Sequence, residues 1–106
     1  MSAYAVGLLK DVRFGAEIVE YLERIDATLA PYCGRFLLHG EPPEVVEGSL
    51  QHDVVVIEFP DIAVARAWYH SSAYQNILPL RTSNAISTVF LVDGLPEGHQ
   101  AKDIFK

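Results

Sequence analysis

The chain has 106 residues, of which 50% are hydrophobic and 21% charged, and its formal net charge is −6. This length fits one domain, and the apolar fraction excludes a disordered chain. The acidic balance disfavours nucleic acid as a partner, because phosphate backbones are bound by clustered Lys and Arg. A lone cysteine, Cys33, cannot form an internal disulfide, and no apolar run is long enough for a membrane span. We therefore expect a small cytoplasmic protein, since the N-terminus also lacks the pattern of a signal peptide.

The first third of the chain predicts a strand, a long helix and a second strand. Residues 3–9 (AYAVGLL) are short, apolar and partly β-branched, which favours a buried strand. Residues 35–39 (RFLLH) are interpreted as the second strand. Between them, Gly34 is expected to end the helix as a left-handed residue. The helix is predicted from apolar residues that recur at spacings of four and three, namely Phe14, Ile18, Leu22, Ile25, Leu29 and Tyr32.

The middle of the chain contains the strongest strand pattern. Glycine and proline at residues 40–43 interrupt the second strand, and residues 44–47 (EVVE) are expected to resume an extended chain. Residues 53–59 (DVVVIEF) are almost continuously apolar and β-branched. Such a run predicts a central strand that is covered on both faces.

The last third predicts two helical segments, a final strand and a tail. Asp61 is a candidate N-cap for a helix that carries Trp68 and Tyr69 on its apolar face. Residues 72–75 (SAYQ) fit a capping box, so we expect a separate short helix whose length Pro79 limits. Residues 86–92 (ISTVFLV) form the last strand, and residues 95–106 are a polar tail.

This order of elements, β-α-β-β-α-β, predicts an α+β protein with a ferredoxin-like fold. In such a fold the helices cover one face of a four-stranded antiparallel sheet and leave the other face bare. Within residues 53–59, apolar side chains occupy both odd and even positions, which point to opposite faces of the sheet. The bare face is therefore expected to be apolar as well. Because a monomer rarely exposes such a patch, we expect two sheets to pack together across a homodimer interface.

Several short motifs resemble those of one known family. They are Glu58-Phe59-Pro60, Ala67-Trp68-Tyr69, Ser71, Tyr74-Gln75 and Pro79-Leu80-Arg81, together with Arg35-Phe36-Leu37 before Gly40 and the closing Leu91-Val92-Asp93-Gly94. Over roughly residues 4–94, the chain resembles the DUF1330 family of the dimeric α+β barrel superfamily. The resemblance implies a ferredoxin-like subunit whose sheet packs against its twofold mate and encloses a barrel.

The chain departs from this family pattern in two places. His39 and Glu41 stand where members more often carry an arginine and a second glycine, which puts a shared anion-binding role of that strand end in doubt. The tail is also longer than usual. We therefore divide the chain into a domain at residues 1–94 and a tail at residues 95–106 that is expected to dock across the dimer, since its apolar Ile104 and Phe105 favour docking.

Trp68, Tyr69, Tyr74 and Arg81 are candidate ligand-binding residues. Aromatic rings beside a guanidinium form a pocket rim that stacks a planar acid and pairs its carboxylate with two hydrogen bonds. The alternative is structural, because Trp68 and Tyr69 are also typical anchors of a helix. In that interpretation Arg81 ties down the loop that follows.

A second group, Arg35, His39, His52 and Glu58, is a candidate for acid–base chemistry. Arg35 and His39 share strand parity, as do His52 and Glu58. If both sets face the enclosed barrel, His39, Glu58 and His52 handle protons in an apolar cavity while Arg35 holds an anionic oxygen. The alternative is a structural ion pair between Glu58 and Arg35 on adjacent strands.

The superfamily includes cofactor-free monooxygenases, heme-degrading enzymes, dismutation and dehalogenation enzymes, and proteins that only bind ligands, so kinship does not choose a reaction. We expect a protein that binds a small hydrophobic molecule, with no cofactor and no metal site, because His39 and Glu41 are too few ligands. It would act as a cofactor-independent enzyme for oxygenation, cyclisation or isomerisation of an aromatic or polyketide-like substrate. A non-catalytic ligand-binding dimer is the alternative, and a protein-binding acidic helix face at Glu17, Glu20 and Glu23 is a third hypothesis.

Overall fold

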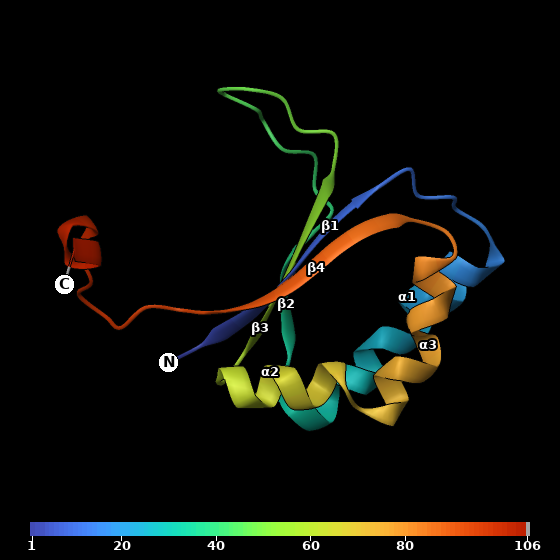
Figure 1. Cartoon of the computed structure of the whole chain (residues 1–106). Coiled ribbons are helices and arrows are strands. Elements are labelled where there is room, and N and C mark those ends of the chain that lie inside the picture. The colour runs from blue at the N-terminus through green and yellow to red at the C-terminus, as the bar shows by residue number, and fades with distance from the viewer. Residues whose placement is uncertain (106) are drawn as a thin grey trace.

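The computed structural model describes residues 1–105 and confirms the predicted α+β, ferredoxin-like fold (Figure 1). One antiparallel sheet has the strand order β2-β3-β1-β4, formed by β1 (Ala3–Lys10), β2 (Arg35–His39), β3 (Asp53–Phe59) and β4 (Ile86–Asp93). The helices α1 (Ala16–Leu29), α2 (Ile62–Tyr69) and α3 (Ser72–Thr82) cover one face of this sheet. Lys106, the last residue of the predicted tail, lies outside the described residues.

Side-chain caps set the start of α2 and of α3. The Oδ1 atom of Asp61 accepts a hydrogen bond from the backbone N–H of Val64 at 2.8 Å, which confirms the predicted N-cap. In α3 the cap is Ser71, whose Oγ accepts from the N–H of Tyr74 at 3.2 Å. The capping box predicted at residues 72–75 is therefore wrong by one residue. The Gln75 side chain donates instead to the backbone oxygen of Tyr69 at 2.7 Å.

The end of α1 also differs from the prediction. The chain leaves the helix through a short 3-10 turn, Ala30–Tyr32, and the left-handed residue is Cys33 (φ 56°), not Gly34. Gly34 is needed for a different reason, because an added Cβ would lie 2.8 Å from both Leu29 Cδ2 and Phe59 Cε1. Phe14 precedes the helix and is 77% exposed, so the buried stripe of α1 begins at Ile18.

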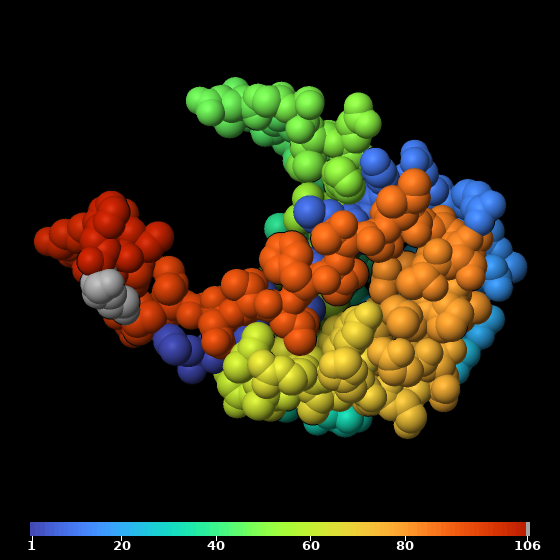
Figure 2. Space-filling model, in the orientation of Figure 1, coloured from blue at the N-terminus to red at the C-terminus, as the bar shows by residue number. Residues whose placement is uncertain are grey.

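Two segments project away from the body of the molecule (Figure 2). The connection between β2 and β3 forms no strand at residues 44–47, so that prediction is wrong, and Val46 is 84% exposed. Beyond β4 the chain ends in a 3-10 turn, Ala101–Phe105, in which Ile104 and Phe105 are 75% and 87% exposed. Figure 2 shows a hollow between these two arms, which we define as residues 40–52 and residues 95–105.

The two faces of the sheet have different surroundings. Alternate side chains of a strand point to opposite faces of the sheet, and cross-strand partners share a face. Ala5 and its partner Ile57 therefore lie on one face, and Val6 and its partner Val56 lie on the other. Ala5 and Ile57 are buried beneath the helices. On the bare face, Val6 and Val56 are half-buried and their neighbour Phe90 is 44% exposed. The bare face is therefore apolar, as the two apolar parities of β3 predicted.

Candidate functional site

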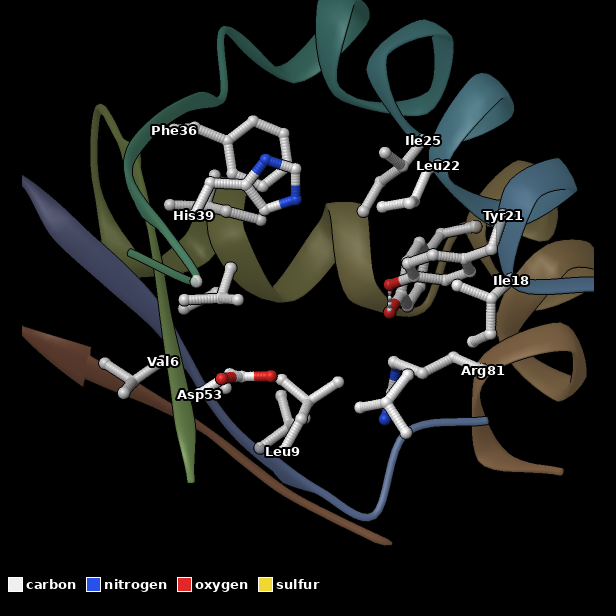
Figure 3. A pocket seen from close by; sticks show the side chains of 18 of the residues that line it. Val6, Leu9, Ile18, Tyr21, Leu22, Ile25, Phe36, His39, Asp53 and Arg81 are labelled. Carbon is white, nitrogen blue, oxygen red and sulfur yellow. Dashed lines mark hydrogen bonds between the residues drawn. The ribbon is translucent and has the colours of Figure 1, made fainter. Parts of the chain in front are cut away.

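A cavity of about 300 Å³ lies between α1 and the helix-covered face of the sheet (Figure 3). This place differs from the one expected, since the sequence pointed to a barrel enclosed by two bare faces. Most of the wall is apolar, with Leu9, Ile18, Leu22, Ile25, Phe36 and Val55 among its residues. The polar side chains that reach it are Tyr21, His39, Asp53, Trp68, Tyr74 and Arg81.

Two tyrosines and one arginine make up the buried polar end of the cavity. Tyr21 on α1 and Tyr74 on α3 share a hydrogen bond between their hydroxyl oxygens at 2.8 Å. Their rings meet edge to face, with centroids 6.2 Å apart. Arg81, in the last turn of α3, is only 5% exposed, and its guanidinium carbon lies 6.0 Å from the centre of the Tyr21 ring.

Arg81 has no carboxylate within 4.0 Å among residues 1–105. The ion pairs in these residues are formed by other side chains, away from Arg81. Burial alone would lower its pKa, but the electrostatic and hydrogen-bonding interactions with Tyr74 and Tyr21 outweigh burial and raise the pKa above its ordinary value. Burial likewise raises the pKa of Tyr21. The cavity therefore contains a buried cation beside two tyrosine hydroxyls, and the carboxylate of Asp53, which also lines it, is more than 4.0 Å from that cation. An anion in contact with the guanidinium would complete this arrangement.

Trp68 is packed in the core, as the structural alternative predicted, and its role in ligand binding stays a prediction. Its indole N–H donates to Thr28 Oγ1 at 3.0 Å, and its ring lies 4.2 Å from that of Tyr74 and 5.3 Å from that of Phe59. It is thus a core anchor that also forms part of the cavity wall. Tyr69 packs against the same aromatic group, 5.6 Å from Tyr74 between ring centres, and lines a smaller neighbouring cavity with Arg81.

His39 lies at the opposite side of the cavity from Arg81 (Figure 3). Strand parity predicted that Arg35 and His39 face the same way, and this is wrong. A register shift between Phe36 and Leu38 pairs Arg35 with Glu58 but His39 with Val55, so the two side chains are on opposite faces. The His39 ring stacks on Phe36, with centroids 4.4 Å apart, and faces the cavity.

The other predicted acid–base residues lie away from this cavity. Arg35 and Glu58 form an ion pair on the bare face, with Nη2 and Oε1 2.7 Å apart, as the structural alternative predicted. His52 precedes β3, and its buried Nδ1 atom finds no hydrogen-bond partner among residues 1–105. Within one chain, His39 and Glu58 are thus separated by the sheet. The catalytic roles of Glu58, His52 and His39 stay predictions.

Sequence reasoning missed two polar residues of the cavity. Tyr21 follows Ile18 by three residues and precedes Ile25 by four, and this spacing predicts that it lies on the buried face of α1. Asp53 shares parity with Val55 and Ile57 and reaches the cavity from the first residue of β3.

Across residues 1–105, no three or more His, Cys, Asp or Glu side chains are grouped so that they could hold a metal ion. Among the helices of the same residues, none is long and apolar enough to cross a membrane.

Comparison with known proteins places the fold and the family. The most similar solved structures include a protein of unknown function from Rhodopseudomonas palustris, RPA0582, with 14% identity and a TM-score of 0.64 over 90% of this chain and 83% of that chain. A dimeric ferredoxin-like protein of unknown function from Jannaschia sp. CCS1 has 13% identity and a TM-score of 0.66 over 89% and 100%.

An antibiotic biosynthesis monooxygenase is also similar, with 14% identity and a TM-score of 0.50 over 88% of this chain and 99% of that chain. At such identities the likeness concerns the fold alone. No curated protein matched the sequence. The family model described as "Domain of unknown function (DUF1330)" matches residues 2–95, and the chain therefore belongs to the DUF1330 family.

Proposed function

We propose that the protein binds a small apolar acid, or an aromatic molecule that ionises, in the cavity between α1 and the sheet. The observation that carries this proposal is Arg81, a buried cation without a carboxylate partner in residues 1–105. A guanidinium presents five N–H donors in a planar fork that matches a carboxylate. An anionic ligand would supply the carboxylate that residues 1–105 do not place within 4.0 Å of Arg81.

The rest of the cavity fits the body of such a ligand. Aromatic and aliphatic side chains line most of it, so an apolar ring is desolvated without loss of hydrogen bonds. The volume of about 300 Å³ is at the small end of ligand sites, which suits a molecule with a single ring or two fused rings. The hydroxyls of Tyr21 and Tyr74 add hydrogen-bonding groups beside the guanidinium.

The chain has a single tryptophan, Trp68, in the cavity wall, so its fluorescence reports directly on binding. We would titrate the protein with benzoate, 3-phenylpropanoate and 2-naphthoate, and with the neutral 3-phenylpropanol as the matched uncharged probe. At least one acid should bind, 3-phenylpropanol should bind about tenfold or more weakly than its acid, and Arg81→Gln should remove that preference. Arg35→Gln, which changes an exposed arginine on the other face, should leave binding unchanged. Equal binding of acid and alcohol, or no binding of any acid, would contradict the proposal.

We also propose a cofactor-independent reaction at this site as a second function. Arg81 and the tyrosine pair would stabilise an enolate or phenolate, and His39 at the other side of the cavity would take the proton. Oxygenation, cyclisation and isomerisation of aromatic or polyketide-like substrates can all begin with such an anion. Support comes from the polar cluster in an apolar cavity, and from the likeness in fold to a structure named as a monooxygenase.

Hydrogen–deuterium exchange tests this second function without knowledge of the substrate. The α-protons of 2-tetralone in D2O should exchange faster with the protein present, as followed by NMR. His39→Gln and Arg81→Gln should each slow the exchange, and Glu58→Gln and His52→Gln test the other two predicted catalytic residues in the same assay. Absence of acceleration by the wild-type protein would favour a ligand-binding protein without catalysis.

We further propose that two chains form a homodimer through the bare face, with the two arms docked on the partner. The radius of gyration, 15.2 Å, exceeds the roughly 13 Å expected of a compact domain of this length. The four strands have eight, five, seven and eight residues, and at about 3.4 Å per residue and about 4.8 Å between strands they cover about 450 Å². Stable dimers bury about 800 Å² per partner, so the exposed apolar side chains of the arms would supply the remainder.

Light scattering after size-exclusion chromatography tests the dimer. The wild-type protein should have twice the chain mass of 11.8 kDa. Val56→Asp on the bare face should give monomers, whereas Val19→Asp on the exposed side of α1 should not. Removal of residues 95–106 should weaken the dimer, and a monomeric wild-type protein would overturn the proposal. A cytoplasmic location rests on composition alone and stays a prediction.

A further inference from the structure

A second cavity, also of about 300 Å³, adjoins the first, and the proposed function does not use it. It lies between the C-terminal end of α3 and the start of β4. Tyr69, Arg81, Thr82, Ala85, Ser87 and Val89 line it. Arg81 and Val89 line both cavities, so the guanidinium is located where the two meet.

Ser87 is the unusual member of this second cavity. Its Oγ atom is fully buried and has no hydrogen-bond partner among residues 1–105. A buried hydroxyl without a partner lowers stability, and native proteins rarely keep one without a reason. Ser87 therefore adds a hydroxyl without a partner among residues 1–105 to a cavity that Arg81 also lines.

The charges around this cavity favour an anion. Among residues 1–105, no Asp or Glu lines it, and Arg81 is its only charged side chain. The negative end of α3 is already capped, because Ser83 N donates to the Pro79 oxygen and Asn84 N donates to the Arg81 oxygen, both at 3.0 Å. The Asn84 side chain also donates to the Leu80 oxygen at 2.9 Å, and Arg13 donates to the Ser83 oxygen. These four carbonyls, at residues 79, 80, 81 and 83, therefore already accept hydrogen bonds, which lessens their repulsion of an anion.

We propose that an oxyanion binds between the Arg81 guanidinium and the Ser87 hydroxyl. The inference rests on the proposed function, because Arg81 is the same anchor, and it deepens that function by naming the second group that holds the anion. A guanidinium has five N–H donors, so it can donate some hydrogen bonds to Tyr21 and Tyr74 and others to an oxyanion. The Ser87 hydroxyl then donates to the same oxyanion, which gives the buried oxygen its missing partner.

The oxyanion has two possible sources that share this chemistry. It is either the carboxylate of an organic ligand whose apolar body occupies the larger cavity, or a free small anion that binds alone. Acetate and inorganic phosphate distinguish the two. If the site holds the ligand's own carboxylate, acetate should compete with 3-phenylpropanoate for the Trp68 fluorescence change. If it holds a free anion, phosphate or acetate should bind alone, as seen from the Arg81 side-chain N–H signal in NMR, without displacing 3-phenylpropanoate.

Ser87→Ala is the decisive variant, with Ser72→Ala, an exposed serine in the first turn of α3, as its control. Ser87→Ala should weaken oxyanion binding about tenfold, since a hydrogen bond to a charged group is lost, and leave 3-phenylpropanol binding unchanged. Its Tm in anion-free buffer should equal or exceed that of the wild type, because an unpaired hydroxyl is removed. Ser72→Ala should change neither property.

The results also separate this inference from the proposed function. If Arg81→Gln abolishes acid binding and Ser87→Ala does not weaken any oxyanion, the role of Ser87 is wrong and the proposed function stands. If Arg81→Gln leaves acid binding intact, or if no oxyanion binds the wild-type protein, both are wrong. An equal loss of acid and alcohol binding in Ser87→Ala would mean that the residue only shapes the cavity.

Discussion

Replacement of Arg81 by methionine should stabilise the protein while it removes anion binding. Arg81 is 5% exposed and has no carboxylate within 4.0 Å in the described chain. Methionine has a similar length and no charge, so it fills the space without the cost of a buried cation. A residue kept for function at the expense of folding should behave in this way.

The size of the effect follows from the surroundings of Arg81. Burial of an ion costs several kcal/mol, and exchange of buried ionic groups for well-packed apolar side chains is neutral or stabilising by about 1–4 kcal/mol. Tyr74 and Tyr21 offset much of this cost at Arg81, since their interactions outweigh burial and raise its pKa. We therefore expect the lower part of this range, about 1 kcal/mol, which corresponds to a rise in Tm of about 4–8 °C for a domain of this size. The hydrogen bond between Tyr21 and Tyr74, at 2.8 Å, does not depend on Arg81 and should survive.

Thermal unfolding followed by circular dichroism measures this change, at one protein concentration and in a buffer without carboxylate or phosphate. Arg35→Met is the matched control, because Arg35 is exposed and its ion pair with Glu58 should contribute about 1 kcal/mol or less. Arg81→Lys keeps the charge and loses the planar fork. If Arg81→Met lowers the Tm by several degrees and Arg81→Lys restores it, Arg81 supports the fold and our reasoning about an incomplete anion site is refuted.

Three other predictions follow from the packing and the titration of the site. Gly34→Ala should cost about 1–3 kcal/mol by overpacking against Leu29 and Phe59, whereas Gly15→Ala, with open space around its Cβ, should be nearly neutral in urea denaturation. Burial raises the pKa of Tyr21 from 10.0, so its contribution to stability is present below about pH 10 and lost above it; Tyr21→Phe should flatten that alkaline decline, and unchanged profiles would contradict this. Gly7→Val should fill part of the cavity and weaken binding of 3-phenylpropanoate in a folded protein, as judged by Trp68 fluorescence.

Local patterns predicted the elements well. β2 and β3 occupy the predicted residues, and Asp61 caps α2, because strand alternation and capping depend on neighbours in sequence. The bounds that shifted did so where two adjacent residues compete for one role. Cys33 takes the left-handed conformation before Gly34, and Ser71 caps α3 before Ser72. Such choices depend on packing with distant residues such as Phe59, which a local pattern does not contain.

The bulge in β2 shows how a single residue can redirect a site. Counting by twos from Arg35 places His39 on the same face, and the register shift between Phe36 and Leu38 reverses that result. A bulge depends on pairing with β3, which lies far along the chain, so β2 alone does not reveal it. The predicted neighbours Trp68, Tyr74 and Arg81 did come together, because two of them share one helix and the third precedes it by a short turn.

Two small residues of β1, Ala5 and Gly7, line the cavity. Ala5 and Gly7 face α1 from the central strand, where larger side chains would fill the space between sheet and helix. Gly7 is not required by its backbone, since its φ is not positive, nor by close packing, since an added Cβ would meet its nearest neighbour, Leu9, at 3.4 Å. Glycine weakens a strand relative to alanine, so packing and backbone alone give no reason for it here. An open cavity gives that reason, and the same residues that make β1 a weaker strand leave the space beside Arg81 in which we propose that a ligand binds.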